Sequence, residues 1–348
     1  MNEVTFTALG MSGAGKTCYI LGMYYDMVIG HNGLALATTG DKARMLEDWM
    51  DNLEDNVGMD RFPSGTSQAN MTNYQFTMNY AYKPLLTVNW LDYPGGVLHA
   101  RGNSITEFEQ LNTSIQKSAA LYIFLDGDNF CDENYKKKLR NVKREARIIN
   151  DYLKKRNMNE GNLPPIVFVI TKSDKYVQYI SSVDEIEKII EEAYASVFAK
   201  NREGCGEVYI VPVSLGNNIA DDDYSGDADP INVHIPFLIG VYHNYSDICR
   251  GYAMDIDDTN RRTQMEIEAQ HANQIKEENK IFFKRRERID EYRRNIDAAR
   301  ADIAGNEEKK KNYFKLLRAV SDELLRESRR NGFTYFCDGK KRDFIPRD

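Results

Sequence analysis

Short apolar runs recur along the first two thirds of the chain at intervals typical of an α/β sheet. Six of them predict strands, over residues 4–9, 74–78, 85–91, 119–125, 166–170 and 208–213. Several contain almost only apolar and β-branched residues, as expected for strands that helices cover on both faces. Helical patterns separate many of the runs, for example at residues 132–156 and 183–200. We therefore expect an α/β fold with a doubly wound, mostly parallel sheet.

A segment of about residues 31–60 interrupts this alternation. Residues 34–38 predict a short strand, and residues 41–54 predict a helix whose apolar face includes Trp49. We interpret the segment as an insertion packed against the edge of the domain.

From about Asn260 the pattern changes, and Glu, Lys and Arg dominate. The apolar positions then follow the three-, four- and seven-residue spacings of a coiled-coil seam: Ile275, Phe282, Ile289, Tyr292, Ile296, Ala299 and Ile303, then Tyr313, Leu317, Val320 and Leu324. Gly305 and Asn306, between the two sets, predict a helix stop. The pattern favours an antiparallel helical hairpin, with a long dimeric coiled coil as the alternative, since a turn and a tolerated glycine look alike in sequence. The expected domains are residues 1–255, 256–331 and a C-terminal tail, 332–348, with no assignable role.

The composition of the chain indicates its location and argues against membrane-spanning, disulfide-rich and zinc-binding classes of protein. The chain has 348 residues, is 42% apolar and carries a net charge of −7, although 23 Lys and Arg oppose 17 Asp and Glu from Asn260 onward. No apolar stretch approaches the roughly 20 residues of a membrane helix, and the chain enters its first strand without a charged and then apolar leader. A cytoplasmic location is expected. The five cysteines are scattered and never spaced as CxxC, so neither a disulfide framework nor a zinc site is suggested.

Residues 10–17 read GMSGAGKT and match the phosphate-binding pattern GxxxxGK[ST]. The octapeptide lies between a predicted strand and a stretch with helical spacing, which is the order that this chemistry requires. Its glycines let backbone N–H groups point at phosphate oxygens, and it leads into the positive end of a helix. Lys16 would reach the β- and γ-phosphates, and Thr17 would bind Mg²⁺.

A second element follows the predicted strand 85–91, where residues 92–96 read DYPGG. An acidic residue such as Asp92 at the carboxyl end of a strand can hold Mg²⁺ through water, and Gly95 can offer its backbone N–H to a γ-phosphate. A simple turn would also explain the Pro-Gly-Gly sequence. The position downstream of a phosphate loop favours the metal site.

The third element, TKSD at residues 171–174, follows another apolar strand. The carboxylate of Asp174 can accept two hydrogen bonds from the N1–H and 2-amino groups of guanine, which adenine does not offer. The stem of Lys172 would lie along the purine ring. After the last predicted strand, a backbone N–H near Ser214 and Leu215 could meet the guanine carbonyl oxygen. The expected nucleotide is GTP.

These four elements, in this order, resemble the translation-factor-related (TRAFAC) class of P-loop GTPases over roughly residues 1–245. The insertion before residues 62–66, the DYPGG turn and the sequence DPINV at residues 229–233 resemble, more narrowly, the prokaryotic double-GTPase group. The class resemblance implies that Thr66 is the threonine of a mobile switch, with its hydroxyl on Mg²⁺ and its N–H on the γ-phosphate. Thr72 and the pair Thr38 and Thr39 are competing candidates.

The expected site follows from the motifs and the resemblance together. The nucleotide-binding residues are Gly10, Ser12, Gly13, Ala14, Gly15, Lys16, Thr17, Cys18, Thr171, Lys172, Asp174, Ser214 and Leu215; the Mg²⁺ ligands are Thr17, Thr66 and Asp92; and the groups acting on the γ-phosphate are Lys16, Thr66 and Gly95.

The chain also departs from the class pattern. Gly96 stands where Ras-like enzymes carry a glutamine that orients the attacking water, so slow hydrolysis is expected. His99, Arg101, Glu107, a partner or a second protomer could supply the missing group. Thr171 replaces the asparagine of NKxD, a substitution that dynamin-like proteins share.

The leading hypothesis is a Mg²⁺-dependent GTPase that hydrolyses GTP to GDP slowly and acts as a switch in a bacterial signalling or conflict system. A partner or self-association would complete its activity, and the helical region would contact a protein effector; a dimer is one form this could take. The alternatives are a dynamin-like mechanochemical membrane GTPase and a GTP-binding scaffold without turnover. Nucleic-acid binding is not expected, because the chain is acidic and its short basic clusters lack interleaved aromatics. Membrane binding is not expected either, because the basic residues of the helical region alternate with acids.

Overall fold

The computed structural model describes residues 3–63, 71–95, 105–160, 163–199, 206–279 and 286–346. The chain divides into two compact units. The first consists of Met1–His243 together with Val320–Asp348, and the second consists of Asn244–Ala319.

A nine-stranded mixed sheet forms the centre of the first unit, in the order β2-β3-β4-β1-β5-β6-β7-β8-β9. The strands are β1 (Glu3–Leu9), β2 (Leu34–Ala37), β3 (Thr72–Tyr80), β4 (Lys83–Asp92), β5 (Ala120–Leu125), β6 (Ile166–Ile170), β7 (Val208–Pro212), β8 (Thr334–Cys337) and β9 (Lys340–Arg342). Strands β4, β1, β5, β6 and β7 pair in parallel, and β2, β3, β8 and β9 pair antiparallel. The α/β class is confirmed, but the sheet is mixed and not mostly parallel.

The hairpin between β3 and β4 explains part of this difference. Only Ala81 and Tyr82 separate the two strands, and both have positive φ, +47° and +64°. Two residues of this conformation form the tight turn that joins antiparallel strands, whereas a parallel pair needs a crossover of a dozen or more residues.

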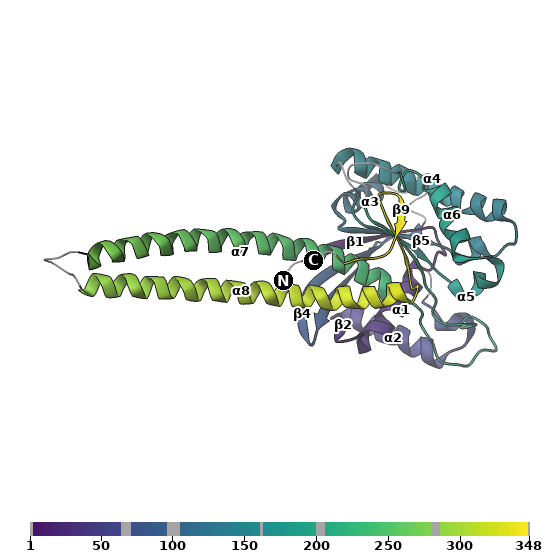
Figure 1. Cartoon of the computed structure of the whole chain (residues 1–348). Coiled ribbons are helices and arrows are strands. Elements are labelled where there is room, and N and C mark those ends of the chain that lie inside the picture. Colours follow the sequence, from purple (N-terminus) through teal and green to yellow (C-terminus); the bar gives the residue numbers. More distant parts are fainter. Residues whose placement is uncertain are drawn as a thin grey trace. The chain divides into compact units, whose positions relative to one another are not determined.

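Helices cover both faces of the sheet (Figure 1). The helices of the described residues are α1 (Lys16–Ile29), α2 (Asp41–Asp55), α3 (Ile105–Lys117), α4 (Tyr135–Glu160), α5 (Ser173–Tyr176), α6 (Val183–Ala193), α7 (His234–Glu278) and α8 (Arg286–Arg329), with short 3₁₀ turns η1 (Gly58–Arg61), η3 (Gly127–Phe130) and η4 (Val177–Tyr179). On one face, α3, α4 and α6 pack a continuous apolar core against β5 and β6. On the other, Tyr19 of α1 and Phe237 of α7 contact Trp90 of β4. Every residue of β5 is buried, as a strand covered on both faces requires.

The two edges of the sheet come from segments outside the predicted strand-and-helix alternation. Strand β2, from the predicted insertion, forms one edge by pairing with β3. The other edge is formed by β8 and β9, which belong to the C-terminal tail. The tail, for which the sequence analysis predicts no role, therefore completes the sheet of the first unit.

The second unit is an antiparallel pair of helical segments from α7 and α8. Their direction follows from contacts such as Asn306 Nδ2 donating to Asn260 Oδ1 at 3.0 Å, and from the stacked rings of Tyr252 and Tyr313 with centroids 4.8 Å apart. The helix stop predicted at Gly305 and Asn306 is wrong, because α8 continues through both residues. Asn306 uses its side chain to contact the other helix, and a glycine inside a helix costs only about 1 kcal/mol, which packing along a long helix outweighs.

The predicted seam is partly correct. Ile289, Ile296 and Leu317 are buried, whereas Ile275 is 46% exposed and Phe282 lies outside the described residues. Among the described residues, no helix combines the length and the apolar character needed to cross a bilayer.

Candidate functional site

The loop of residues 10–17 connects the end of β1 to the start of α1, in the strand–loop–helix order that its motif predicts. Gly13 and Gly15 have φ angles of +83° and +77°, in the left-handed region where glycine is favoured. Gly15 also caps α1, and a Cβ there would lie 3.1 Å from a side-chain carbon of Thr171. The first N–H groups of α1 lack helical acceptors, so the loop ends at a favourable position for an anion.

Lys16 is nearly buried and bends back over this loop. Its Nζ donates to the carbonyl oxygens of Gly10 at 2.9 Å and Met11 at 3.1 Å. Burial lowers the pKa of Lys16, and the negative charges of Asp92 and Glu145 oppose that effect. The amine is therefore held beside the loop in surroundings where a further anion would stabilise its charged form.

The oxygens of Thr17 and Asp92 lie side by side at the carboxyl ends of the central strands. Thr17 Oγ1 donates to Asp92 Oδ2 at 3.1 Å, and Asp92 is completely buried at the end of β4, paired with Ala8 of β1. A hydroxyl and a carboxylate are hard oxygen donors, which suit Mg²⁺. These two residues thus fit the metal that the motif implies, whereas Thr66, the third predicted ligand, lies outside the described residues.

Gly95 approaches the loop so closely that only glycine fits. A Cβ at this position would lie 2.0 Å from the backbone nitrogen of Ser12 and 2.4 Å from the carbonyl carbon of Met11. The segment after β4 is therefore in direct contact with residues 10–17.

Asp174 and Ser214 lie together after β6 and β7. Ser214 Oγ donates to Asp174 Oδ1 at 2.5 Å and accepts from the backbone N–H of Gly216 at 3.1 Å. The hydroxyl holds the carboxylate in one orientation, and the chain after β7 therefore positions the residue that is predicted to select the base.

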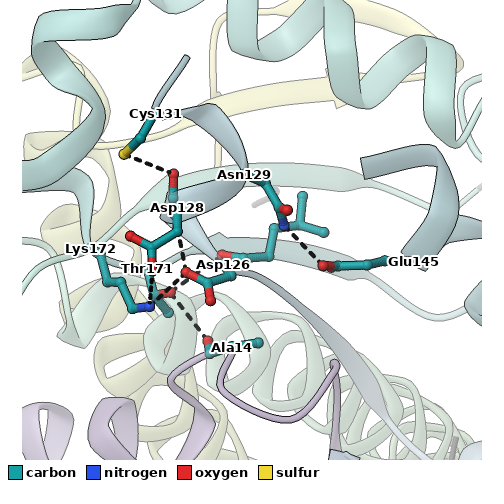
Figure 2. A network of polar contacts seen from close by, with 10 residues as sticks. Ala14, Asp126, Asp128, Asn129, Cys131, Glu145, Thr171 and Lys172 are labelled. Atoms are coloured by element: carbon teal, nitrogen blue, oxygen red, sulfur yellow. Dashed lines mark hydrogen bonds and ion pairs between the residues drawn. The ribbon is translucent and has the colours of Figure 1, made fainter. Parts of the chain in front are cut away.

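Thr171 and Lys172 link this region to the loop of residues 10–17 (Figure 2). Thr171 Oγ1 lies 3.2 Å from the carbonyl oxygen of Ala14 and 3.3 Å from that of Leu125, and can donate to either. Lys172 Nζ forms ion pairs with Asp126 at 2.8 Å and Asp128 at 2.6 Å. Burial lowers the pKa of Lys172, but its hydrogen bonds to the two carboxylates outweigh burial and raise it overall.

One pocket of about 430 Å³ gathers most of the predicted residues. It is lined by Ser12, Gly13, Gly15, Lys16, Thr17, Cys18, Gly95, Thr171, Lys172, Asp174, Ser214 and Leu215. Gly10, Ala14 and Asp92 lie outside its lining. A Cβ at Gly10 would lie 2.8 Å from the Cβ of Phe124, so that glycine packs against β5, while Ala14 is buried within the loop and Asp92 is buried at the end of β4.

The sequence-based prediction missed two parts of the site. Asp126 and Asp128 hold Lys172, and their signal was an acidic residue directly after the buried strand β5. Met59 and Phe62 form an apolar part of the pocket wall; Met59 comes from the end of the predicted insertion and Phe62 lies just after it, where no motif marks them.

Comparisons with known proteins add little to this geometry. No protein-family profile matches the chain, and no curated protein matches it. Among solved structures, the GTPase-like domain of S. cerevisiae Ski7, bound to GTP, is similar at 18% identity with a TM-score of 0.34. The match covers 65% of this chain and 48% of that one, so the chain spans about half the length of the structure it matches.

Proposed function

We propose that the pocket binds GTP with Mg²⁺, and that the chain hydrolyses GTP slowly to GDP as a nucleotide-controlled switch. The observation that carries the proposal is the convergence of the Gly-rich loop and the Asp174–Ser214 pair on one pocket. The first part suits phosphates and the second suits a guanine edge. The volume of the pocket, about 430 Å³, lies in the range of ligand pockets in general, about 300–1,000 Å³.

Each group has a role in this proposal. Backbone N–H groups of the loop and the amine of Lys16 would hold the phosphates, and Thr17 and Asp92 would hold Mg²⁺, which supplies positive charge when bound. Water would attack the γ-phosphorus in line with the leaving oxygen of GDP, while Lys16 and the N–H of Gly95 stabilise the charge that develops. The proposed switch role of Thr66 and the water-positioning roles of His99, Arg101 and Glu107 belong to residues whose side chains lie outside the described part.

The phosphate half is tested with Lys16→Ala. Calorimetric titration of the purified chain with GTP in excess Mg²⁺ should show binding to the wild type and none to the variant. Lys309→Ala, which removes an exposed lysine of α8, is the matched control and should bind as the wild type does. Equal affinities for all three proteins would contradict the assignment of the loop.

The base-selecting half is tested with Asp174→Asn. An asparagine keeps an acceptor for the N1–H group but replaces the second acceptor with an N–H donor. The variant should lose affinity for GTP and gain affinity for xanthosine triphosphate, whose 2-oxo group accepts a hydrogen bond. Asp223→Asn, at an exposed position, should keep the wild-type preference. An unchanged preference in Asp174→Asn would refute this role.

Turnover is measured separately, as phosphate release over hours with Mg²⁺. The switch proposal expects slow release of phosphate that Lys16→Ala abolishes. Tight GTP binding without any release would instead support the scaffold. Co-sedimentation with liposomes would support the membrane-remodelling alternative.

The remaining parts of the proposal concern the partner of the protein and the biological system in which it acts. We propose that the second unit contacts a protein effector, directly or as a dimer, and that the switch acts in a bacterial signalling or conflict system. The proposal of a bacterial signalling or conflict system rests only on the resemblance of the sequence motifs to the prokaryotic double-GTPase group. Limited proteolysis of the full chain should give different fragments with a non-hydrolysable GTP analogue and with GDP, and identical fragments would contradict a switch.

A further inference from the structure

Among the described residues, two groups of side chains that could hold a metal ion lie in the first unit and share His234 at the start of α7. One adds Asp26 near the end of α1 and His31 just after that helix, and the other adds Glu323 and Glu327 near the end of α8. None of these residues lines the pocket described above.

His234 is held in one orientation by a carboxylate. Its Nδ1 lies 2.9 Å from Asp26 Oδ2, and the same oxygen lies 2.9 Å from His31 Nε2. The two imidazole rings stack with centroids 4.1 Å apart. A carboxylate at Nδ1 favours a hydrogen on that nitrogen, which leaves the lone pair of a neutral ring on Nε2.

The second nitrogen of His234 is the informative atom. The residue is only 7% exposed, and Nε2 is buried without a hydrogen-bond partner among the described residues. Buried polar atoms almost always form hydrogen bonds, because a buried donor or acceptor without a partner destabilises the fold by about 1–3 kcal/mol. A buried imidazole lone pair beside carboxylates is a set of donor atoms that suits a metal cation.

Glu323 and Glu327 supply the oxygen donors. They stand four residues apart on α8, so they share one face of the helix, and they are 2% and 6% exposed. One ligand atom of each lies within 4.8 Å of the others and of a ring nitrogen of His234.

The other hydrogen bonds of the two carboxylates orient them. Glu323 Oε2 accepts from Asn32 and Arg326, both at 2.6 Å, and Glu327 Oε1 accepts from Arg330 at 3.2 Å. These bonds each use one oxygen of a carboxylate, so the other oxygen can act as a ligand. Two arginines do not neutralise three buried or half-buried carboxylates, which leaves the cluster short of positive charge unless a histidine is protonated or a cation binds.

We propose that His234, Glu323 and Glu327 bind a divalent metal ion of the zinc type, with Asp26 as the positioning residue behind His234. One imidazole and two carboxylates form a common ligand set for Zn²⁺, which leaves a fourth position for water or a neighbouring side chain. The histidine disfavours Mg²⁺ and Ca²⁺, which prefer oxygen ligands alone. The ion would fasten the end of α1 to the first turn of α7 and the last turns of α8, all within the first unit.

The test uses the full chain, stripped with a chelator and kept in excess Mg²⁺, which competes with Zn²⁺ for the oxygen ligands Thr17 and Asp92 of the nucleotide pocket. Zn²⁺ is added, free ion is removed by gel filtration, and bound metal is measured by mass spectrometry alongside the melting temperature. We expect one Zn²⁺ per chain and a melting temperature several degrees higher. His234→Gln and Glu327→Gln should each reduce affinity at least tenfold, and Asp26→Asn should reduce it about 10- to 100-fold. His271→Gln, an exposed histidine of α7, is the matched control and should bind like the wild type.

Co²⁺ provides an independent readout. It should give the visible bands of a low-coordinate nitrogen and oxygen site, without the near-ultraviolet band of a thiolate ligand. A thiolate band, no retained Zn²⁺, or equal retention by the wild type and by either Gln variant would overturn the proposal. Circular dichroism establishes which variants fold. If His234→Gln does not fold, the metal affinity of the isosteric Glu327→Gln decides the question. The proposal does not depend on GTP binding, so either can fail alone.

Discussion

Replacing Gly95 with alanine would push a methyl group into the main chain of the Gly-rich loop. The added carbon would lie 2.0 Å from Ser12 N, 2.4 Å from the Met11 carbonyl carbon and 2.6 Å from Ser12 Cα. These are backbone atoms, which no change of rotamer can move, so the two segments must separate by roughly 1 Å. Overpacking of this kind typically costs about 1–3 kcal/mol. For a unit of this size the melting temperature should fall by on the order of 5 °C.

The same substitution should weaken the binding of GTP much more than the binding of GDP. If the N–H of Gly95 meets the γ-phosphate, its displacement removes a hydrogen bond to a charged group, worth about 1.5–3 kcal/mol. That free energy corresponds to a loss of roughly 10- to 150-fold in GTP affinity, whereas GDP affinity should change by less than about threefold. Calorimetric titration with a non-hydrolysable GTP analogue and with GDP measures both.

The control is Gly251→Ala. This helical glycine has open space where its Cβ would lie, so alanine should stabilise the protein by about 0.5–1 kcal/mol without changing nucleotide affinity. Two results would refute the reasoning about Gly95. An unchanged melting temperature would contradict the close approach, and equal losses for both nucleotides would contradict the γ-phosphate role.

Three further predictions test other parts of the structure. Gly305→Ala should raise the melting temperature, because α8 continues through this position and a Cβ there meets nothing within 4 Å; a fall in a thermal denaturation scan would favour the turn predicted from sequence. Glu185→Gln should destabilise the protein by about 1–2 kcal/mol at neutral pH in urea titrations, since buried Lys138 loses an ion pair at 2.5 Å with a partly exposed carboxylate but keeps its hydrogen bond to the carbonyl oxygen of Tyr179. Burial raises the pKa of Glu185, but Lys138 and Ser181 lower it overall below 4.5, so its contribution is complete above pH 4.5 and is lost as pH falls through the lowered value; the difference between the two proteins should shrink there. Burial raises the pKa of Cys18 to about 11, so alkylation monitored by mass spectrometry should be slow at pH 8, accelerate up to about pH 11 and be slowed by GTP; fast alkylation at pH 8 would contradict this environment.

Much of the fold could be predicted because buried strands leave a clear signal. The run at residues 119–125 becomes β5, which is buried throughout, and the run at residues 166–170 coincides with β6. Strand direction was harder to predict, because an apolar run does not indicate whether its strand pairs with a neighbour in parallel or antiparallel. The available sign of an antiparallel pair was the interval between the runs at residues 74–78 and 85–91, which is too short for the crossover that a parallel pair needs.

The C-terminal elements show where local patterns fail. Strands β8 and β9 are short, and β9 reads KKR, so only pairing with the existing sheet edge makes them strands. Gly305 looked like a helix stop, yet tertiary contacts between α7 and α8 override its weak local preference.

The candidate site was predicted where chemistry demands residues at fixed spacing along the chain. The phosphate-loop pattern and the TKSD sequence both led to residues that line the same pocket. The partners that hold Lys172, and the apolar wall at Met59 and Phe62, depend on contacts between distant segments. Apart from the acidic residue that directly follows β5, no local sequence pattern indicates these contacts.

The most direct test of the central claim is calorimetric titration of the purified chain, in Mg²⁺, with GTP and with ATP. The proposed site predicts binding of about one GTP per chain and no measurable binding of ATP. Binding of ATP in preference to GTP, or of neither nucleotide, would contradict the proposed function.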